Sequence, residues 1–213
     1  MGLFDIFKSA KVADIVNVDK KKPAGSDLIT RIQPSQLVRS NSDVKKWRTA
    51  LQIAESTIRP DRTELIRIYK DVILDAHLSS VMQQRTNKVL SRSFKIKDSN
   101  GDTDKEKTAL LSSAWFERFM RLALEAKYYG FSLIEFGNLT NDAFETVEIV
   151  PRQYVCPEKN IVFTNLGRSN AVNYTRPPYS NWALFVGETK DLGLLNIATP
   201  IILWKRLVQA TWA

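Results

Sequence analysis

One segment restricts the possible folds of this chain more than any other, because it places several large apolar side chains on one face of a helix. These side chains recur with the period of an α-helix: Leu111, Trp115, Phe119, Leu122 and Ala126. Burying a large apolar side chain contributes roughly 1.5–3 kcal/mol. The pattern predicts a core helix over about residues 104–129, which ends at Gly130 as its C-cap.

The residues after Gly130 read as two strands. FSLIEFG (131–137) and FETVEIV (144–150) are separated by a polar segment, which is typical of a β-hairpin with a longer loop. Three carboxylates fall in this hairpin: Glu135, Glu145 and Glu148. On alternating strands they are expected to form the solvent-facing side rather than an acid–base pair.

Further elements follow the same rules of periodicity. Helices are predicted over residues 62–73 and 76–90, where Asp75 either caps the second helix or marks a kink in one long helix. Its inner face is expected to carry these side chains: Leu78, Val81, Met82, Arg85 and Val89. A half-buried strand is predicted at residues 93–97, with a turn at Asn100-Gly101.

The rest of the chain predicts short strands and one more helix. YVCP, NIVFTN and WALFV read as strands with proline-rich connections. A final helix is predicted over about residues 192–212, which Pro200 should start, kink or break. The fold class is therefore α+β, with helices packed on small antiparallel sheets or hairpins and an extended basic N-terminal arm. We expect an arm over residues 1–60, partly flexible, and an α+β region over residues 61–213 that is truncated at its C-terminus.

Basic residues concentrate in the first half of the chain, which carries a formal net charge of +8. Two clusters lie in the arm: Lys20, Lys21 and Lys22 before a proline, and Lys45, Lys46 and Arg48 around Trp47. A one-sided basic surplus favours a polyanionic partner such as nucleic acid, with Trp47 available for stacking, and each neutralised phosphate adds about 0.9 to the salt slope of binding. A solvated basic arm explains the same residues.

The N-terminal segment has an apolar side of its own. Leu3, Phe4 and Phe7 can share a helical face against the charged Asp5 and Lys8. Such a segment either docks onto its own protein or a neighbouring subunit, which makes Phe4 and Phe7 interface candidates, or lies on a membrane surface. No apolar run in the sequence reaches the roughly 18–20 residues that a membrane span needs.

The sequence contains no pattern of residues that predicts catalysis. His77 is the only histidine and Cys156 the only cysteine, so no metal-ligand spacing and no intramolecular disulfide can be assigned. Glycine-rich phosphate loops and zinc-protease motifs are also missing from the sequence. We expect no catalytic residue, no metal and no cofactor, and a reducing compartment.

The order of segments resembles that of a known family. ELIRIYKDVILDAHLSSVMQQRTNKVLSRSFKI is similar to the early block of Mu-like tailed-phage portal proteins, including an L-D-x-H-L-x-S-type junction. YYGFSLIEF resembles the family's helix-to-strand passage with its G-x-S-x-x-E pattern, here Gly130, Ser132 and Glu135. VEIVPRQYV and the helix ending at Trp212 are similar to the segments that follow.

The resemblance covers roughly residues 60–213 and implies a structural role without enzymatic activity. Portal proteins form rings, usually of about twelve subunits, at one capsid vertex, where DNA enters during packaging and leaves at ejection. The implied partners are further copies of the chain, the terminase large subunit, capsid and head-completion proteins, and non-specifically bound double-stranded DNA. Assembly would take place in the bacterial cytoplasm. Arg85 and Lys88 become candidates for inter-subunit ion pairs or for solvated charges.

The resemblance leaves two other functions open. A basic nucleic-acid-binding module would bind DNA tightly with a strong dependence on salt. A peripheral membrane protein would use residues 2–16 as its anchor. Members of the family are about twice as long as this chain, so a large C-terminal part would be missing from it.

Overall fold

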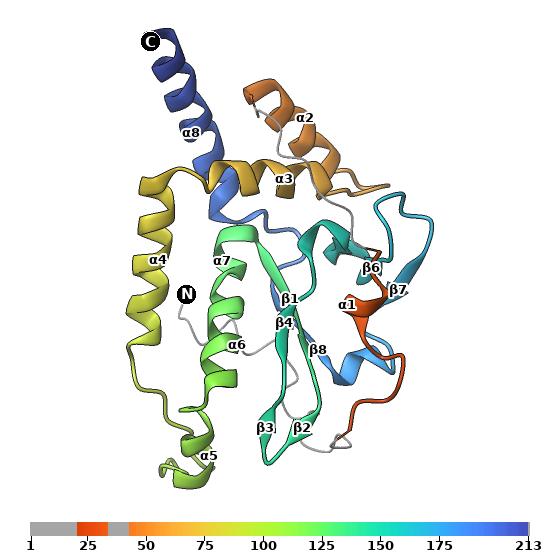
Figure 1. Ribbon diagram of the computed structural model, residues 1–213, viewed down its shortest axis with the longest axis vertical. Coiled ribbons are helices and arrows are strands. Elements are labelled where there is room, and N and C mark those ends of the chain that lie inside the picture. The colour runs from red at the N-terminus through yellow and green to blue at the C-terminus, as the bar shows by residue number, and fades with distance from the viewer. Residues whose placement is uncertain (1–20, 34–42, 213) are drawn as a thin grey trace.

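The computed structural model describes residues 21–33 and 43–212 (Figure 1). The α-helices are α1 (Leu28–Arg31), α2 (Val44–Ala54), α3 (Thr63–Val72), α4 (Ala76–Leu90), α5 (Lys105–Leu110), α6 (Ala114–Leu124), α7 (Ala126–Tyr129) and α8 (Gly193–Trp212). The strands are β1 (Phe131–Phe136), β2 (Leu139–Thr140), β3 (Ala143–Phe144), β4 (Val147–Ile149), β5 (Val155–Cys156), β6 (Ile161–Phe163), β7 (Ala171–Asn173) and β8 (Ala183–Gly187). The described residues confirm a mixed fold of helices and small antiparallel sheets.

Strand β1 is the centre of the largest sheet. It pairs antiparallel with β4, where Ile134 lies opposite Ile149, and with β8, where Leu133 lies opposite Phe185. The hairpin expected from the sequence is therefore confirmed, and β2 and β3 extend it toward its turn. The pairing with β8 makes β1 an interior strand.

Both faces of β1 are covered, and all six of its residues are buried. Ile134 and Phe136 pack against α6 on one face, whereas Phe131 and Leu133 pack on the other against α1 and the small sheet of β5, β6 and β7. Glu135 lies on this second face and is only 5% exposed. The prediction that it faces solvent was wrong, because residues 21–33 cover that side of the sheet.

The other two carboxylates of the hairpin are exposed, as expected. Glu145 follows β3 and Glu148 lies in β4 at the edge of the sheet. Glu148 is the β4 residue opposite Glu135 in the register. Two carboxylates on paired strands thus have opposite environments, because only one of them is covered by another segment.

The predicted long helix over residues 104–129 is divided into three. Its apolar face exists, since Phe119, Leu122 and Ala126 are buried against the sheet, but α5 ends at Leu110 and α6 begins at Ala114. The Ser113 hydroxyl donates a 2.6 Å hydrogen bond to the Leu110 carbonyl at this break. Serine side chains compete in this way with the hydrogen bonds of a continuous helix.

Gly130 ends the helical segment as predicted. Its φ is +88°, in the left-handed region, and it lies between α7 and β1. A Cβ at this position would collide with the backbone carbonyl of Asp191 before α8. Glycine is therefore required both for the turn and for the close approach of the two segments.

Residues 93–97 do not form the predicted strand. Only Lys97 makes a bridge, to Thr103 across the turn that contains Gly101. The apolar residue of the segment that led to the prediction, Phe94, packs instead against Phe116 at the edge of the α6 cluster. A strand needs a partner strand for its backbone hydrogen bonds, and no neighbouring described segment supplies one here.

Helices α3 and α4 form where the sequence predicts them, but α4 is more exposed than expected. None of its 15 residues is fully buried. Leu78 and Met82 pack against the cluster formed with α3 and α8, as predicted, whereas Val81 and Arg85 are exposed. Helix α4 lies at the side of the molecule and contacts it through a narrow strip of residues (Figure 1). The predicted inner face therefore included too many residues.

Asp75 caps α4 and also joins it to α8. Its Oδ1 accepts from the Leu78 backbone N–H at 3.0 Å and its Oδ2 pairs with Lys205 at 2.6 Å. The hydrogen bond from Lys205, followed by that from Leu78, lowers the pKa of Asp75. A lowered pKa in the folded state means that Asp75 stabilises the fold above its unfolded pKa of about 3.9, and that this stabilisation is lost as pH falls through the folded value.

We expect Asp75→Ala to lower the free energy of unfolding by about 1 kcal/mol at pH 7, the usual contribution of an N-cap. Urea denaturation at pH 7 and at pH 3 measures this difference. The Asp75→Asn variant retains a capping oxygen and should lose less. If Asp75→Ala were as stable as the original chain at pH 7, the cap would contribute nothing.

Helix α8 continues through Pro200, which neither starts nor breaks it. The helix begins at Gly193 near the glycine turn of α7, and its second half extends beyond the rest of the molecule at the C-terminal end (Figure 1). Lys205 pairs with Asp75, and Arg206 pairs with Asp71 at 2.8 Å. These two ion pairs hold α8 against the junction of α3 and α4.

Candidate functional site

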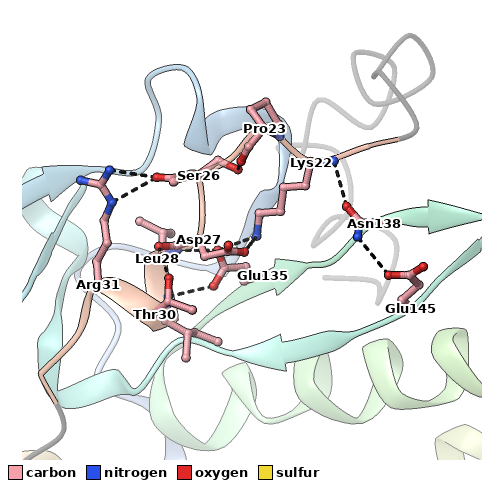
Figure 2. Close-up of polar contacts among 12 residues, drawn as sticks. Lys22, Pro23, Ser26, Asp27, Leu28, Thr30, Arg31, Glu135, Asn138 and Glu145 are labelled. Carbon is pink, nitrogen blue, oxygen red and sulfur yellow. Dashed lines mark hydrogen bonds and ion pairs between the residues drawn. The ribbon is translucent and has the colours of Figure 1, made fainter.

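A buried carboxylate fastens the N-terminal segment to the central sheet. Glu135 accepts two backbone hydrogen bonds from the start of α1, from Leu28 N at 2.6 Å and from Ile29 N at 2.9 Å (Figure 2). The Lys22 ammonium lies 2.8 Å from Glu135 and 2.7 Å from Asp27. Three donors from one short segment thus converge on one side chain of β1.

The segment is held at its two ends as well. Lys22 N donates to Asn138 Oδ1 at 2.9 Å beside the hairpin (Figure 2). At the other end, Gln33 N donates to the Thr164 carbonyl at 2.8 Å. Between these points Leu28 is 1% exposed and Ile32 is 7% exposed. Residues 21–33 are therefore packed on the body by apolar contact and by hydrogen bonds at both ends.

Because of this packing, the residues of the first basic cluster, Lys20, Lys21 and Lys22, do not share one environment. Lys22 is one of the arm residues proposed to contact nucleic acid, but its side chain is 6% exposed and faces two carboxylates. Lys21 is exposed, and Lys20 lies outside the described residues. An ammonium group that is enclosed by carboxylates has little free surface for a phosphate.

We expect Lys22→Met to lower stability rather than nucleic-acid affinity. Methionine keeps much of the length of the side chain but leaves Glu135 without its cation, and leaving a buried acceptor short of a partner costs about 1–3 kcal/mol. Urea denaturation and DNA titration of the same variant separate the two effects. Lys21→Met is the matched control, since Lys21 is exposed and should change stability by less than about 0.5 kcal/mol.

The second basic cluster is exposed on α2. Lys45, Lys46 and Arg48 all lie on the surface of this helix. Trp47 does not lie with them, because it packs against the core and donates its Nε1 hydrogen to Asn196 Oδ1 at 3.1 Å. Trp47 is half-buried against the core, which leaves less of its ring for stacking, whereas the side chains of Lys45, Lys46 and Arg48 are exposed.

Helix α8 carries a large exposed apolar face that runs from Ile197 to its C-terminal end. We define the α8 face by its exposed apolar residues: Ile197, Ile201, Trp204, Leu207, Val208 and Trp212. These side chains are between 52% and 88% exposed, although Leu195, Ile202 and Leu203 on the opposite side of the helix are buried. Contiguous apolar patches on a protein surface mark interaction sites.

The remaining interface candidates lie in different places. Arg85 and Lys88 are exposed on α4, and no ion pair with a carboxylate of the described residues is found for either of them. Phe4 and Phe7 lie outside the described residues. Arg85 and Lys88 therefore remain predicted subunit contacts. Their side chains are accessible, but no described residue identifies their partner.

Neither reactive side chain of the sequence forms a site in the described residues. Cys156 is buried in β5, and burial followed by the nearby Glu158 raises the pKa of its thiol. A thiol in this state is a weak nucleophile. His77 is exposed in the first turn of α4, and no group of metal-ligating side chains is present in residues 21–33 and 43–212.

Two buried arginines were missed by the sequence analysis. Arg62 is 2% exposed and donates to Glu158 and to the backbone carbonyls of Thr189 and Asp191. Arg152 joins Glu125 to the start of β1. No periodicity predicts a buried arginine, because its partners come from distant parts of the chain. Glu135, by contrast, stands in the G-x-S-x-x-E pattern and could have been found there.

Comparison with known proteins assigns the chain to one family. The sequence model of a family described as "Portal protein of Mu bacteriophage" matches residues 66–213, which is more than half of the chain. No curated protein matches the chain. Within the described residues, no helix has the length and apolar character needed to cross a membrane. The matched region contains Glu135, the α8 face and the whole central sheet, and the chain therefore belongs to the family of Mu-like bacteriophage portal proteins.

Proposed function

We propose that this chain is a subunit of a portal ring, the structural conduit at one vertex of a phage capsid. DNA would pass through the ring into the capsid during packaging and out of it at ejection. The subunit's role in this proposal is mechanical: it binds its neighbours and encloses a passage. Family membership supports the proposal, and portal proteins are structural rather than enzymatic.

The observation that carries the proposal is the α8 face. Six apolar side chains, two of them tryptophans, lie exposed along one side of a helix that projects from the body (Figure 1). Aromatic residues in the centre of an interface supply much of the binding energy. We therefore place the contact with a neighbouring subunit on this face. The terminase large subunit, capsid and head-completion proteins remain the partners expected from the family.

Native mass spectrometry at near-physiological salt tests the proposal. We expect oligomers that approach a ring of about twelve subunits, with monomers at low concentration. A chain that stays monomeric and binds DNA tightly would instead support the second candidate, a basic nucleic-acid-binding module. The exposed Lys45, Lys46 and Arg48 favour that candidate, and their neutralisation should then reduce the salt slope by about 0.9 for each lost phosphate contact.

A further inference from the structure

Each subunit of a ring needs two different contact surfaces. In a ring of more than two subunits, every contact joins two distinct surfaces of neighbouring copies, whereas a surface that contacts itself produces a dimer and stops there. The α8 face supplies one of these surfaces. The other must accept an exposed apolar side chain of α8 and lie elsewhere on the same chain.

A groove between α2 and α3 has an apolar lining that suits this purpose. Its volume is about 320 Å³, at the lower end of the ~300–1,000 Å³ range of ligand pockets. Ala50, Ile53 and Ile68 form the apolar part of the lining. Ala50 and Ile68 are buried, but Ile53 is 42% exposed. A groove of this size accommodates one or two large side chains rather than a whole helix.

The polar part of the lining favours a neutral aromatic side chain. Arg67 lines the groove, and its guanidinium pairs with Glu64 at 3.0 Å. The Arg67 Nε hydrogen is buried and has no acceptor within residues 21–33 and 43–212. The face of an aromatic ring attracts a guanidinium and accepts a weak hydrogen bond from an N–H group. An indole ring therefore matches both the apolar and the polar lining.

The α8 face offers such a ring without an opposing charge. Trp204 lies near the centre of this face and is 56% exposed. The two cations of α8, Lys205 and Arg206, are each paired with an aspartate at the junction of α3 and α4. Residues 207–212 carry no charge. The approach of Trp204 to the groove is thus not opposed by an unpaired cation of α8.

Both surfaces lie at the same end of the molecule. Helix α8 projects at this end, and α2 lies beside it (Figure 1). Trp47 of α2 donates its Nε1 hydrogen to Asn196 of α8, which fixes the two helices relative to each other. Contact surfaces at one level allow a neighbour to be placed by rotation alone, as a closed ring requires, whereas an added translation produces an open filament.

We infer that the groove between α2 and α3 receives Trp204 of the neighbouring copy, so that the α8 face of each subunit packs on α2 of the next. The inference rests on the proposed function, since it names the surface that the α8 face contacts in the ring. In this arrangement the indole ring packs on Ile53 and Ile68, and the face of the ring meets Arg67. Tryptophans that fill a pocket at the centre of an interface are among the residues that contribute most to binding.

Substitutions in the groove test the inference in the full chain. Ile53→Asp puts a charge into the lining, and Thr49→Arg obstructs the groove from an exposed position. We expect each variant to keep the circular dichroism spectrum of the original chain and to associate at least about thirtyfold more weakly in native mass spectrometry and light scattering. Gln52→Asp is the matched control, because Gln52 is an exposed residue of α2 outside the lining, and it should associate normally.

Mixing two variants shows which surfaces meet. A chain with Ile201→Asp and Trp204→Asp keeps its groove, and the Ile53→Asp chain keeps its α8 face. Each should therefore stay monomeric alone, whereas the mixture should form a heterodimer with one copy of each chain and no larger complex. Groove variants that associate as the original chain does, or a mixture without heterodimers, would overturn the inference. If the original chain associates in the same experiment, either result leaves the proposed portal role intact, whereas an original chain that stays monomeric contradicts that role as well.

Discussion

Replacing Glu135 by alanine is expected to lower the free energy of unfolding by about 3–5 kcal/mol, the cost of breaking a buried pair by removing one partner. The carboxylate holds the Lys22 ammonium and two backbone N–H groups of α1. Without it, the two N–H groups lose their acceptor, Lys22 keeps only its ion pair with Asp27, and Leu28 loses the hydrogen bond of its backbone N–H. Guanidinium denaturation followed by circular dichroism measures the loss.

Two variants isolate the cause of this effect. Glu135→Gln preserves the shape and one accepting oxygen but removes the charge, so it should lie between the original chain and the alanine variant. Glu148→Ala removes a carboxylate from the paired position on β4, where it is exposed, and should change stability by less than about 0.5 kcal/mol. Equal effects of Glu135→Ala and Glu148→Ala would show that the docked segment contributes nothing.

Glu135→Ala should also release residues 21–33 before the rest of the molecule unfolds. The segment contacts the body through Glu135, through Asn138 and through the core around Leu28. Hydrogen exchange is suited to detect such local opening. The Leu28 and Ile29 amide hydrogens should then exchange much faster in the variant, while the amides of β1 retain their protection.

Placing aspartates on the α8 face is expected to abolish self-association. Ile201→Asp combined with Trp204→Asp inserts two charges into the centre of the proposed subunit contact. Loss of a single central residue in an interface often costs 2 kcal/mol or more, which corresponds to at least about a thirtyfold weaker association. Native mass spectrometry and light scattering across a range of protein concentrations measure the change.

The controls for this prediction are measured at exposed positions of the same helix. Both replaced side chains are more than half exposed, so the stability of the monomer should change little. Gln209→Asp adds a charge to a polar, exposed position of α8 and should leave association unchanged. A double variant that still assembles as the original chain does would place the subunit contact elsewhere, with α4 and its exposed Arg85 and Lys88 as the next surface to test.

Local patterns predicted much of the fold because their causes are local. The apolar period around Phe119 and Leu122 marked the helix that packs on the sheet, and Gly130 marked its end. Asp75 was found as an N-cap because its oxygen bonds a backbone N–H three residues ahead. The strand predicted at residues 93–97 is absent, and the long helix breaks at Ser113. Both differences show the limit of local patterns, because these structures depend on contacts that the local sequence does not specify.

The candidate sites depended on contacts that no local pattern contains. The sequence by itself determined the fold class, the family resemblance and the basic character of the arm. Only the tertiary structure decided that Glu135 is buried, that Lys22 is enclosed rather than exposed, and that the apolar face of α8 is left uncovered. The physical reason is that side-chain burial depends on segments more than a hundred residues apart, as in the hydrogen bond between Leu28 and Glu135.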